Sequence, residues 1–191
     1  QLNTNWLMEL KTYTESKGLI FFASPFDERS IHLLNDYGVS IYKWASSEIT
    51  NLKNLRIAAS YNKPMIISTG MCDLADIFEA VEVCQIADND EIILLHCISL
   101  CPTELNEINL KALETLKSTF NFFVGLSDHT MGSTAAIASV AMGSKVIEKH
   151  ITLDRKMNGP DHFFATEPNE FIVYVKKIRE AEICLGHGKI E

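Results

Sequence analysis

The feature that most constrains the fold is a repeated alternation between short apolar runs and longer segments with helical periodicity. The apolar runs are Gly18–Ser24, Ser40–Ser46, Met65–Thr69, Glu91–Cys97, Phe122–Ser127 and Lys145–Ile151. Most of them are continuously apolar, which is typical of parallel strands buried on both faces. Consecutive runs begin roughly 20–30 residues apart, the spacing of repeated βα units. The sequence therefore predicts an α/β fold.

The segments around these runs carry apolar residues at the spacing of amphipathic helices. Helices are expected at Trp6–Lys17, Glu28–Tyr37, Leu52–Tyr61, Leu74–Ala87, Asn109–Ser118, Thr134–Met142 and Asn169–Cys184. Asp73 stands where an N-terminal cap is expected, and Asp27 or Glu28 enters the second helix in the same way.

Polar residues gather where each predicted strand ends. The strand ends read Ser24, Lys43 with Ser46 and Glu48, Ser68-Thr69, His96 with Ser99, Ser127 with His129, and Glu148 with His150. A (β/α)8 barrel uses the ends of all its strands, whereas a doubly wound sheet concentrates its chemistry at one switch point. No glycine-rich nucleotide-binding loop is present in the sequence. We therefore expect a TIM barrel.

A closed barrel of this kind has eight strands, and the sequence offers six. We expect residues 1–184 to form a partial barrel that lacks the first two strands, and residues 185–191 to begin a linker. An open sheet leaves unpaired strand edges, so the chain alone is expected to be marginally soluble or to pair its edges with another copy.

Composition excludes several classes of function. Asp and Glu (25) outnumber Lys and Arg (17), which gives a net charge of −8 and argues against a nucleic-acid partner. No apolar run reaches the length of a membrane span, and no signal peptide is visible, so no membrane role is expected. The five cysteines have no disulfide-framework spacing, which predicts a reduced, cytoplasmic setting.

Hydroxyl and charged groups at three strand ends are candidate anion ligands. Lys43 supplies a positive charge beside Ser46, and Glu48 could act as an acid or base. Ser68 and Ser127 each follow an apolar run and can bind an anion without adding charge repulsion. A surface lysine paired with a nearby glutamate, and a plain helix entrance at Ser68, are the simpler interpretations.

His129 and His150 end neighbouring predicted strands. Two imidazoles side by side, with Glu148 and Asp161 nearby, would suit a divalent metal such as Mn²⁺, Mg²⁺ or Zn²⁺. A lone histidine is more often a core or capping residue. Cys97 and Cys101 have neither redox nor zinc spacing, so free thiols are expected.

The motifs together resemble the sialic acid synthase family. They are Phe22-Ala23-Ser24-Pro25-Phe26-Asp27, Tyr42-Lys43-Trp44-Ala45-Ser46-Ser47-Glu48, Lys63-Pro64-Met65-Ile66-Ile67-Ser68-Thr69-Gly70, Leu95-His96-Cys97, Gly125-Leu126-Ser127-Asp128-His129-Thr130, Val146-Ile147-Glu148-Lys149-His150 and Gly159-Pro160-Asp161-His162. The resemblance covers nearly the whole chain. It implies condensation of phosphoenolpyruvate with N-acetylmannosamine or a related N-acetylated hexose, with release of phosphate.

The resemblance also implies roles for individual residues. Phosphoenolpyruvate would be held by Ser24, Lys43, Ser46, Ser68, Ser99 and Ser127, and Mn²⁺ or Mg²⁺ by His129 and His150. Glu48 would transfer a proton or orient substrate, and Glu148 and Asp161 would contact the sugar or metal-bound water. The family resemblance further implies a homodimer and a C-terminal domain beyond the linker.

Cys101 stands where the family usually has tyrosine, which weakens one expected phosphate contact. The family's catalytic glutamate and second lysine, normally on the first two strands, are not in this sequence. Two alternatives remain: an aldolase with a Schiff base on Lys43, or an inactive truncated barrel that serves as a binding or assembly module.

Overall fold

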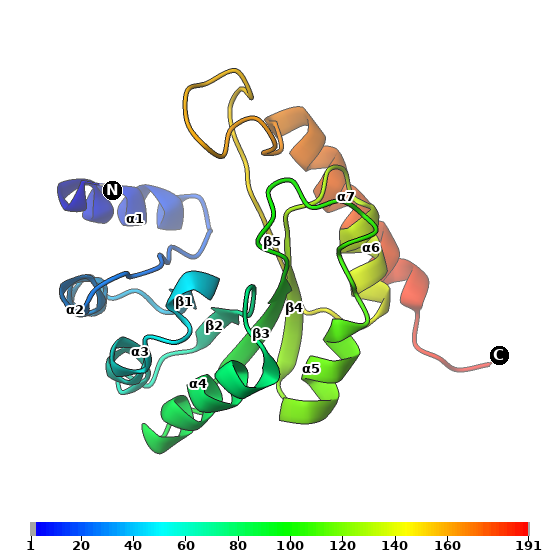
Figure 1. Ribbon diagram of the computed structural model, residues 1–191. Coiled ribbons are helices and arrows are strands. Elements are labelled where there is room, and N and C mark those ends of the chain that lie inside the picture. The colour runs from blue at the N-terminus through cyan, green and yellow to red at the C-terminus, as the bar shows by residue number, and fades with distance from the viewer. Residues whose placement is uncertain (1–2, 191) are drawn as a thin grey trace. The chain divides into compact units, whose positions relative to one another are not determined.

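A computed structural model describes residues 3–190 of the chain. From Glu28 onward, α-helices and strands alternate along the chain as the sequence predicts, whereas the two helices before Ser40 follow one another with no strand between them (Figure 1). The α-helices are α1 Leu7–Ser16, α2 Glu28–Asp36, α3 Leu52–Ala59, α4 Leu74–Ile86, α5 Ala112–Phe120, α6 Thr134–Ala141 and α7 Pro168–Leu185. The strands are β1 Tyr42–Trp44, β2 Met65–Ser68, β3 Ile92–Cys97, β4 Phe123–Asp128 and β5 Val146–Lys149. Two short 3-10 turns lie at Thr4–Trp6 and Ser46–Glu48.

The strands are hydrogen-bonded in the order β1-β2-β3-β4-β5, so neighbours in the chain are neighbours in the sheet. The β1–β2 and β4–β5 pairs are both parallel. Parallel neighbours require a crossover between them, and each βα unit supplies one helix for that purpose. The continuous apolar character of β2 is explained by burial of all its residues.

The predicted strand at Gly18–Ser24 is the part of the prediction that is wrong. Within residues 3–190, this segment has no strand assignment, although it leads directly toward α2. Leu19 and Ile20 are each 63% exposed. An apolar run becomes a strand only when a partner strand accepts its ladder hydrogen bonds, and the described chain provides no such partner here.

Both predicted N-terminal caps are confirmed, and the cap of α2 is Asp27 rather than Glu28. The Asp27 carboxylate accepts a hydrogen bond from the backbone N–H of Ser30 at 2.6 Å, and the Ser30 hydroxyl completes a capping box. Asp73 caps α4 by accepting from the N–H groups of Ala75 and Asp76. These carboxylates satisfy N–H groups that a helix start leaves without partners.

The chain divides into two compact units. The first runs up to Ile67 and includes Cys72–Ile93, so it contains α1 to α4, β1 and most of β2. Helix α3 packs against both α2 and α4. Asn89 is buried and donates from its amide to the carbonyls of Ala59 and Lys63, at 3.2 and 2.9 Å. This amide joins the chain before β2 to the chain before β3.

The second unit comprises Ser68–Met71 and the chain from Leu94 onward. Helices α5 and α6 pack against β4, and α7 lies alongside α6 (Figure 1). Ala136, Val140, Tyr174 and Ile178 form the buried cluster between α6 and α7. The predicted helix at Asn169–Cys184 is confirmed, with one residue more at each end. Residues 186–190 have neither helix nor strand.

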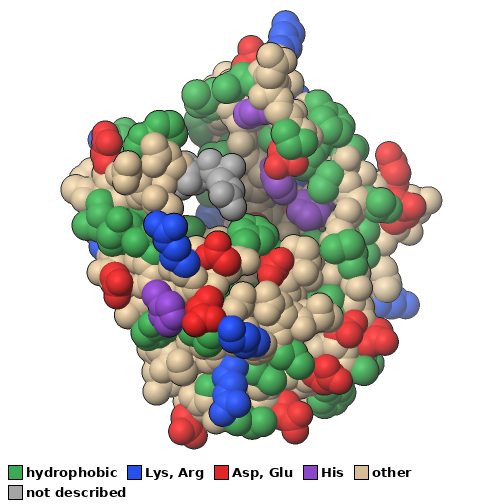
Figure 2. Space-filling view, turned by 60° about the vertical axis from the view of Figure 1, so that its left-hand side comes forward, with side chains coloured by type: hydrophobic (Ala, Val, Ile, Leu, Met, Phe, Trp, Pro, Cys, Tyr) green, Lys and Arg blue, Asp and Glu red, His purple; other side chains and the backbone are tan. Residues whose placement is uncertain are grey.

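The surface agrees with the acidic composition. On the face drawn in Figure 2, acidic and basic side chains are interspersed rather than gathered into a basic stripe. Across residues 3–190, none of the helices has both the length and the apolar character that crossing a bilayer would require.

Candidate functional site

The carboxyl ends of β4 and β5 in the second unit bring together three cross-strand pairs of polar residues. The pairs are Ser127 with Glu148, Asp128 with Lys149, and His129 with His150. Because successive side chains of a strand point to opposite faces, the first and third pairs share one face and the middle pair occupies the other.

The Ser127–Glu148 pair is joined by a hydrogen bond. The Ser127 hydroxyl donates to Glu148 Oε1 at 2.6 Å, and Ser127 is only 2% exposed. A short bond from a neutral donor to a carboxylate is among the stronger hydrogen bonds in proteins. The pair therefore combines an anionic acceptor with a buried hydroxyl beside the two histidines.

The rings of His129 and His150 lie side by side, as their places at neighbouring strand ends predict. Their centroids are 5.1 Å apart, and the edge of His150 packs against Phe164 with centroids 5.0 Å apart. His129 Nδ1 lies 2.8 Å from the carbonyl oxygen of Ile98. Since a carbonyl only accepts, Nδ1 carries the proton in this contact, and Nε2 keeps its lone pair.

The two histidines have opposite pKa shifts. The Cys97 thiol, 3.9 Å from His129 Nδ1, is the largest cause that raises the pKa of His129, and the Ile98 carbonyl and the Glu148 charge act in the same direction. Burial opposes these effects. Burial is also the largest cause that lowers the pKa of His150, and the charge of His129 adds to it.

His129 and His150 alone can supply only part of the coordination shell of a divalent ion. Two imidazoles supply two nitrogen ligands, and the Nδ1–H contact with Ile98 is the kind of second contact that orients a ligating histidine. Within residues 3–190, no group of three or more His, Cys, Asp or Glu side chains is arranged to hold a metal. An ion here would take its other ligands from water or substrate oxygens.

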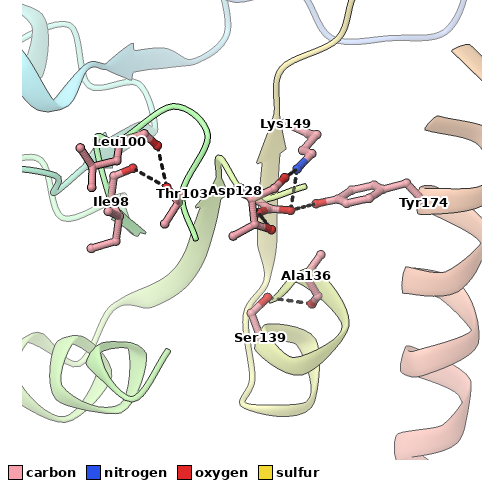
Figure 3. Close-up of polar contacts among 9 residues, drawn as sticks. Ile98, Leu100, Thr103, Asp128, Ala136, Ser139, Lys149 and Tyr174 are labelled. Atoms are coloured by element: carbon pink, nitrogen blue, oxygen red, sulfur yellow. Dashed lines mark hydrogen bonds and ion pairs between the residues drawn. The ribbon is translucent and has the colours of Figure 1, made fainter. Parts of the chain in front are cut away.

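The middle pair, Asp128 with Lys149, is a buried ion pair that was not among the residues predicted from the sequence. Lys149 Nζ lies 3.0 Å from Asp128 Oδ2, and their side chains are 5% and 0% exposed. Tyr174 of α7 donates its hydroxyl hydrogen to the same carboxylate at 2.7 Å (Figure 3). Asp128 and Lys149 belong to the two motifs that also contain the predicted site residues, and this position was the signal in the sequence that could have identified them. No pattern in the sequence pointed to Tyr174.

The loop after β5 carries Asp161, which is exposed. Thr152 holds the loop through a 2.7 Å hydrogen bond with His162 Nδ1. Arg155 donates to the Ala165 carbonyl at 2.9 Å and pairs with Glu170 of α7. The negative charge of Asp161 acts to raise the pKa values of His150 and Cys101.

The candidate residues at the end of β3 and in the turn after it differ in burial. His96 is buried, with Nε2 2.7 Å from the Ile108 carbonyl, and burial lowers its pKa. Ser99 and Cys101 are exposed. Within residues 3–190, neither Cys97 nor Cys101 forms a disulfide. Although Cys101 is exposed, partial desolvation of its thiol is the largest cause that raises its pKa.

The remaining candidates of the second unit lie at the end of β2. Ser68 is 3% exposed, and the neighbouring Thr69 hydroxyl donates to the Leu95 carbonyl at 3.1 Å. The Thr69 backbone N–H also donates to Leu95. These bonds fix the end of β2 beside β3.

In the first unit, Lys43, Ser46 and Glu48 lie within one strand end and the 3-10 turn that follows it. Lys43 is 7% exposed and donates to the Trp44 carbonyl at 3.0 Å. Glu48 is half-buried, and Asn51 donates to its Oε2 at 3.1 Å. The Trp44 indole N–H donates to the Glu48 carbonyl at 2.8 Å. The interpretation of Lys43 as an exposed surface lysine is therefore wrong.

Ser24 is half-buried in the same unit. It lines a cavity of about 370 Å³ together with residues of α1 and α2, including Leu7 and Leu34. Ser24 therefore belongs to the connection before α2 and not to a strand end.

Comparison with known proteins places the whole chain in one family. The sequence profile described as "NeuB family" matches residues 1–190. An uncharacterized protein of Methanocaldococcus jannaschii is 46% identical over 99% of this chain and 56% of its own length. The N,N'-diacetyllegionaminic acid synthase of Campylobacter jejuni is 44% identical over 94% of this chain and 54% of its own length. The chain therefore spans about half the length of these curated relatives.

Solved structures give the same result. An N-acetylneuraminic acid (sialic acid) synthetase from Leptospira borgpetersenii, crystallised with citrate, superposes with a TM-score of 0.94 at 36% identity. The match covers 100% of this chain and 67% of that one. A truncated 3-deoxy-D-arabino-heptulosonate 7-phosphate synthase from Thermotoga maritima shares the fold alone, with a TM-score of 0.83 at 18% identity. The predicted fold class, an incomplete TIM barrel, is confirmed, and the chain belongs to the NeuB family.

Proposed function

We propose that the protein containing this chain joins phosphoenolpyruvate to an open-chain N-acetylated hexose, such as N-acetylmannosamine, and releases phosphate. The observation that carries the proposal is the pairing of His129 with His150 beside Ser127 and Glu148 in a NeuB-family chain. Curated relatives named legionaminic acid synthase, pseudaminic acid synthase and N-acetylneuraminate-9-phosphate synthase support the reaction class.

The reaction needs a carbon nucleophile, an electrophilic aldehyde and one water. C3 of phosphoenolpyruvate attacks the aldehyde carbon, the new C–C bond forms, and the aldehyde oxygen takes up a proton. Water then adds at C2 of the former phosphoenolpyruvate, and the C–O bond to phosphate breaks. The balance needs no oxidant, reductant or covalent enzyme intermediate.

We assign anion binding to buried groups at strand ends. Lys43, Ser46, Ser68 and Ser127 are proposed to hold phosphoenolpyruvate, with Ser24 and Ser99 as further contacts. The burial of Lys43, Ser68 and Ser127 supports this assignment, because a desolvated donor binds an anion more strongly than an exposed one. Ser24 and Ser99 have weaker support, since Ser24 precedes α2 and Ser99 is exposed.

His129 and His150 are proposed to hold Mn²⁺ or Mg²⁺. When bound, the ion would polarise the aldehyde oxygen of the sugar as a Lewis acid. The support is the pair geometry and the Ile98 carbonyl, which leaves Nε2 of His129 as an acceptor. Holding the two substrates in attack geometry would be the main contribution of the chain's own residues.

Carboxylates are proposed to orient the sugar and to move protons. Glu148 accepts from Ser127 next to the histidine pair, so it can receive a further donor from the sugar or from water. Glu48, held by Asn51, is proposed as the other proton-transfer or orienting group. Asp161 is proposed to contact the sugar or a metal-bound water from the loop after β5.

We further propose a cellular compartment and an oligomeric state for the protein. A reduced, cytoplasmic compartment is proposed, and the lack of a disulfide-framework spacing among the cysteines in the sequence supports it. A homodimer of the full-length protein is also proposed.

The direct test is to incubate the full-length protein with phosphoenolpyruvate, Mn²⁺ and a panel of N-acetylated mannose-type and bacillosamine-derived sugars, and to measure phosphate release. Release that depends on both sugar and metal supports the proposal. Absence of release with every sugar would contradict it. Borohydride trapping of a carbonyl substrate on Lys43 would instead favour the aldolase alternative, and we expect no trapping because the reaction needs no Schiff base.

Saturable binding of phosphoenolpyruvate, measured by isothermal titration, separates the synthase from an inactive assembly module. We expect binding at low millimolar concentration or tighter, in the ordinary range of enzyme substrates. A full-length protein that shows neither binding nor turnover would favour the assembly module.

A further inference from the structure

The Asp128–Lys149 pair lies between the two proposed substrate-facing pairs but on the other face of β4 and β5. Asp128 stands between Ser127 and His129, and Lys149 stands between Glu148 and His150. Tyr174 reaches this face from α7, 46 positions along the chain from Asp128 (Figure 3). Asp128 and Lys149 are therefore joined through the backbone directly to the neighbouring site residues.

Both oxygens of the Asp128 carboxylate are fully used. Oδ1 accepts from the backbone N–H of Thr130 at 2.9 Å and from its hydroxyl at 2.7 Å. Oδ2 accepts from Lys149 Nζ at 3.0 Å and from the Tyr174 hydroxyl at 2.7 Å. Four donors in fixed directions leave a carboxylate that is 0% exposed with one orientation.

Lys149 extends the network across the strand ends. Besides contacting Asp128, its ammonium group donates to the Thr130 carbonyl. It also lies 5.3 Å from the centre of the Tyr174 ring, within the range of a cation–π contact. One side chain of β5 thus contacts the residues on both sides of His129, the carboxylate of Asp128 and the backbone carbonyl of Thr130.

A buried ion pair is weak evidence for stability, because an apolar pair of similar volume is often as stable. The network also fixes the geometry of the two strand ends, where the ladder hydrogen bonds between β4 and β5 stop. Burial, the charge of Asp128 and the bond to it raise the pKa of Tyr174, so its hydroxyl keeps the proton that it donates.

We propose that Asp128, Lys149 and Tyr174 are positioning residues that set the His129–His150 and Ser127–Glu148 pairs from the opposite face of the sheet. The inference rests on the proposed function, because it is the metal and the phosphoenolpyruvate that require the two pairs to lie together on one face. These three residues touch no substrate; they act through the backbone of the residues beside them.

Thr130 offers the sharpest test, because two substitutions separate the hydrogen bond from packing. Thr130→Val keeps the shape and removes the hydroxyl donor to Asp128, whereas Thr130→Ser keeps the donor and removes a methyl group. Thr130 is 1% exposed, so if packing alone mattered, Thr130→Val would keep more Mn²⁺ affinity than Thr130→Ser. The positioning role predicts the reverse order: Thr130→Ser should preserve Mn²⁺ affinity and Thr130→Val should lose it.

Tyr174→Phe removes a second donor, and Tyr42→Phe is its matched control. Tyr42 is 0% exposed, and its hydroxyl donates to the Ile31 carbonyl at 2.9 Å in the first unit. Both variants lose one buried tyrosine hydrogen bond, so similar losses of thermal stability are expected. Only Tyr174→Phe should change the proposed metal pair.

The measurement is the Mn²⁺ dissociation constant of the full-length protein, with kcat for phosphate release as a second readout. We expect Thr130→Val and Tyr174→Phe to weaken Mn²⁺ binding about 10-fold or more, the usual effect of losing an outer contact of a metal ligand. Thr130→Ser and Tyr42→Phe should remain near the wild type. Equal Mn²⁺ affinity of Thr130→Val and Thr130→Ser, or of Tyr174→Phe and Tyr42→Phe, would overturn the inference.

The same data separate this inference from the proposed function. A wild-type protein that binds Mn²⁺ but releases no phosphate would refute the proposed reaction, and the comparison of dissociation constants would still decide the positioning role. A wild-type protein that does not bind Mn²⁺ would overturn the inference, because there would be no metal pair to position.

Discussion

The imidazole rings of His129 and His150 lie with their centroids 5.1 Å apart, at the ends of neighbouring parallel strands. If both are metal ligands, His129→Ala or His150→Ala should weaken Mn²⁺ binding by more than the roughly 10–100-fold that loss of an outer contact causes. Metal-dependent phosphate release should be abolished. Equilibrium dialysis with Mn²⁺ and a phosphate assay measure the two effects.

His187→Ala is the control for these variants, because His187 is exposed and lies beyond α7. It should bind Mn²⁺ and turn over as the wild type does. Unchanged Mn²⁺ affinity in His129→Ala would refute the metal role of the pair.

Metal binding should weaken as the pH falls, because a protonated imidazole cannot ligate. The pKa of His129 is raised above its ordinary value of about 6.5, mainly by the Cys97 contact, so proton competition begins at a higher pH than for an ordinary histidine. Below about pH 6, affinity should be clearly reduced. A Mn²⁺ titration series from pH 8 to pH 5 would show this, and a flat profile would contradict it.

Removing the Ser127 hydroxyl should weaken binding of phosphoenolpyruvate and also removes the hydrogen bond from Ser127 to Glu148. A hydrogen bond to a charged group contributes about 1.5–3 kcal/mol, so Ser127→Ala should raise the KM roughly 10-fold or more. Ser118→Ala, on the exposed side of α5, removes a serine hydroxyl elsewhere and should not change the KM. An equal KM in both variants would remove Ser127 from the proposed site.

Gly125 is required by the close approach of β4 and β5. A Cβ at this position would meet the Val146 carbonyl oxygen and lie 2.6 Å from Leu95 Cδ2. Gly125→Ala should therefore cost about 1–3 kcal/mol or more of unfolding free energy, the range for overpacking a core. Gly18→Ala meets no atom within 4 Å and carries only the strain of a φ of +72°, so chemical denaturation should find a smaller loss.

Stability should also depend on pH through His96. Burial lowers its pKa in the folded state, so the unfolded chain binds a proton more readily. This contribution to stability is complete above about pH 6.5 and is lost as the pH falls through the lower folded-state pKa. His150 acts in the same direction, and His129, with its raised pKa, acts in the opposite one.

The measurement for His96 is urea denaturation at pH 7.5 and at pH 5.5. The wild type should lose more unfolding free energy between these values than His96→Gln, which cannot take up the proton. A variant with the same pH dependence as the wild type would show that His96 contributes nothing to it.

Local patterns in the sequence were sufficient for much of the fold. Continuous apolar runs identified five strands, helical periodicity identified the helices between them, and the carboxylates of Asp27 and Asp73 identified two helix starts. Each of these signals depends on residues a few positions apart, which is why one sequence is enough to read them. The motifs around His129 and His150 led to the family for the same reason.

Contacts between distant residues were decided by the tertiary structure alone. The run at Gly18–Ser24 has strand composition but no ladder partner among the described residues, and composition cannot supply one. Sequence position could not show that Asp128 and Lys149 pair with each other, nor that Tyr174 meets them from α7. The register of β4 against β5 and the packing of α7 fix these contacts, because a carboxylate is satisfied only by donors that the fold brings within hydrogen-bond distance.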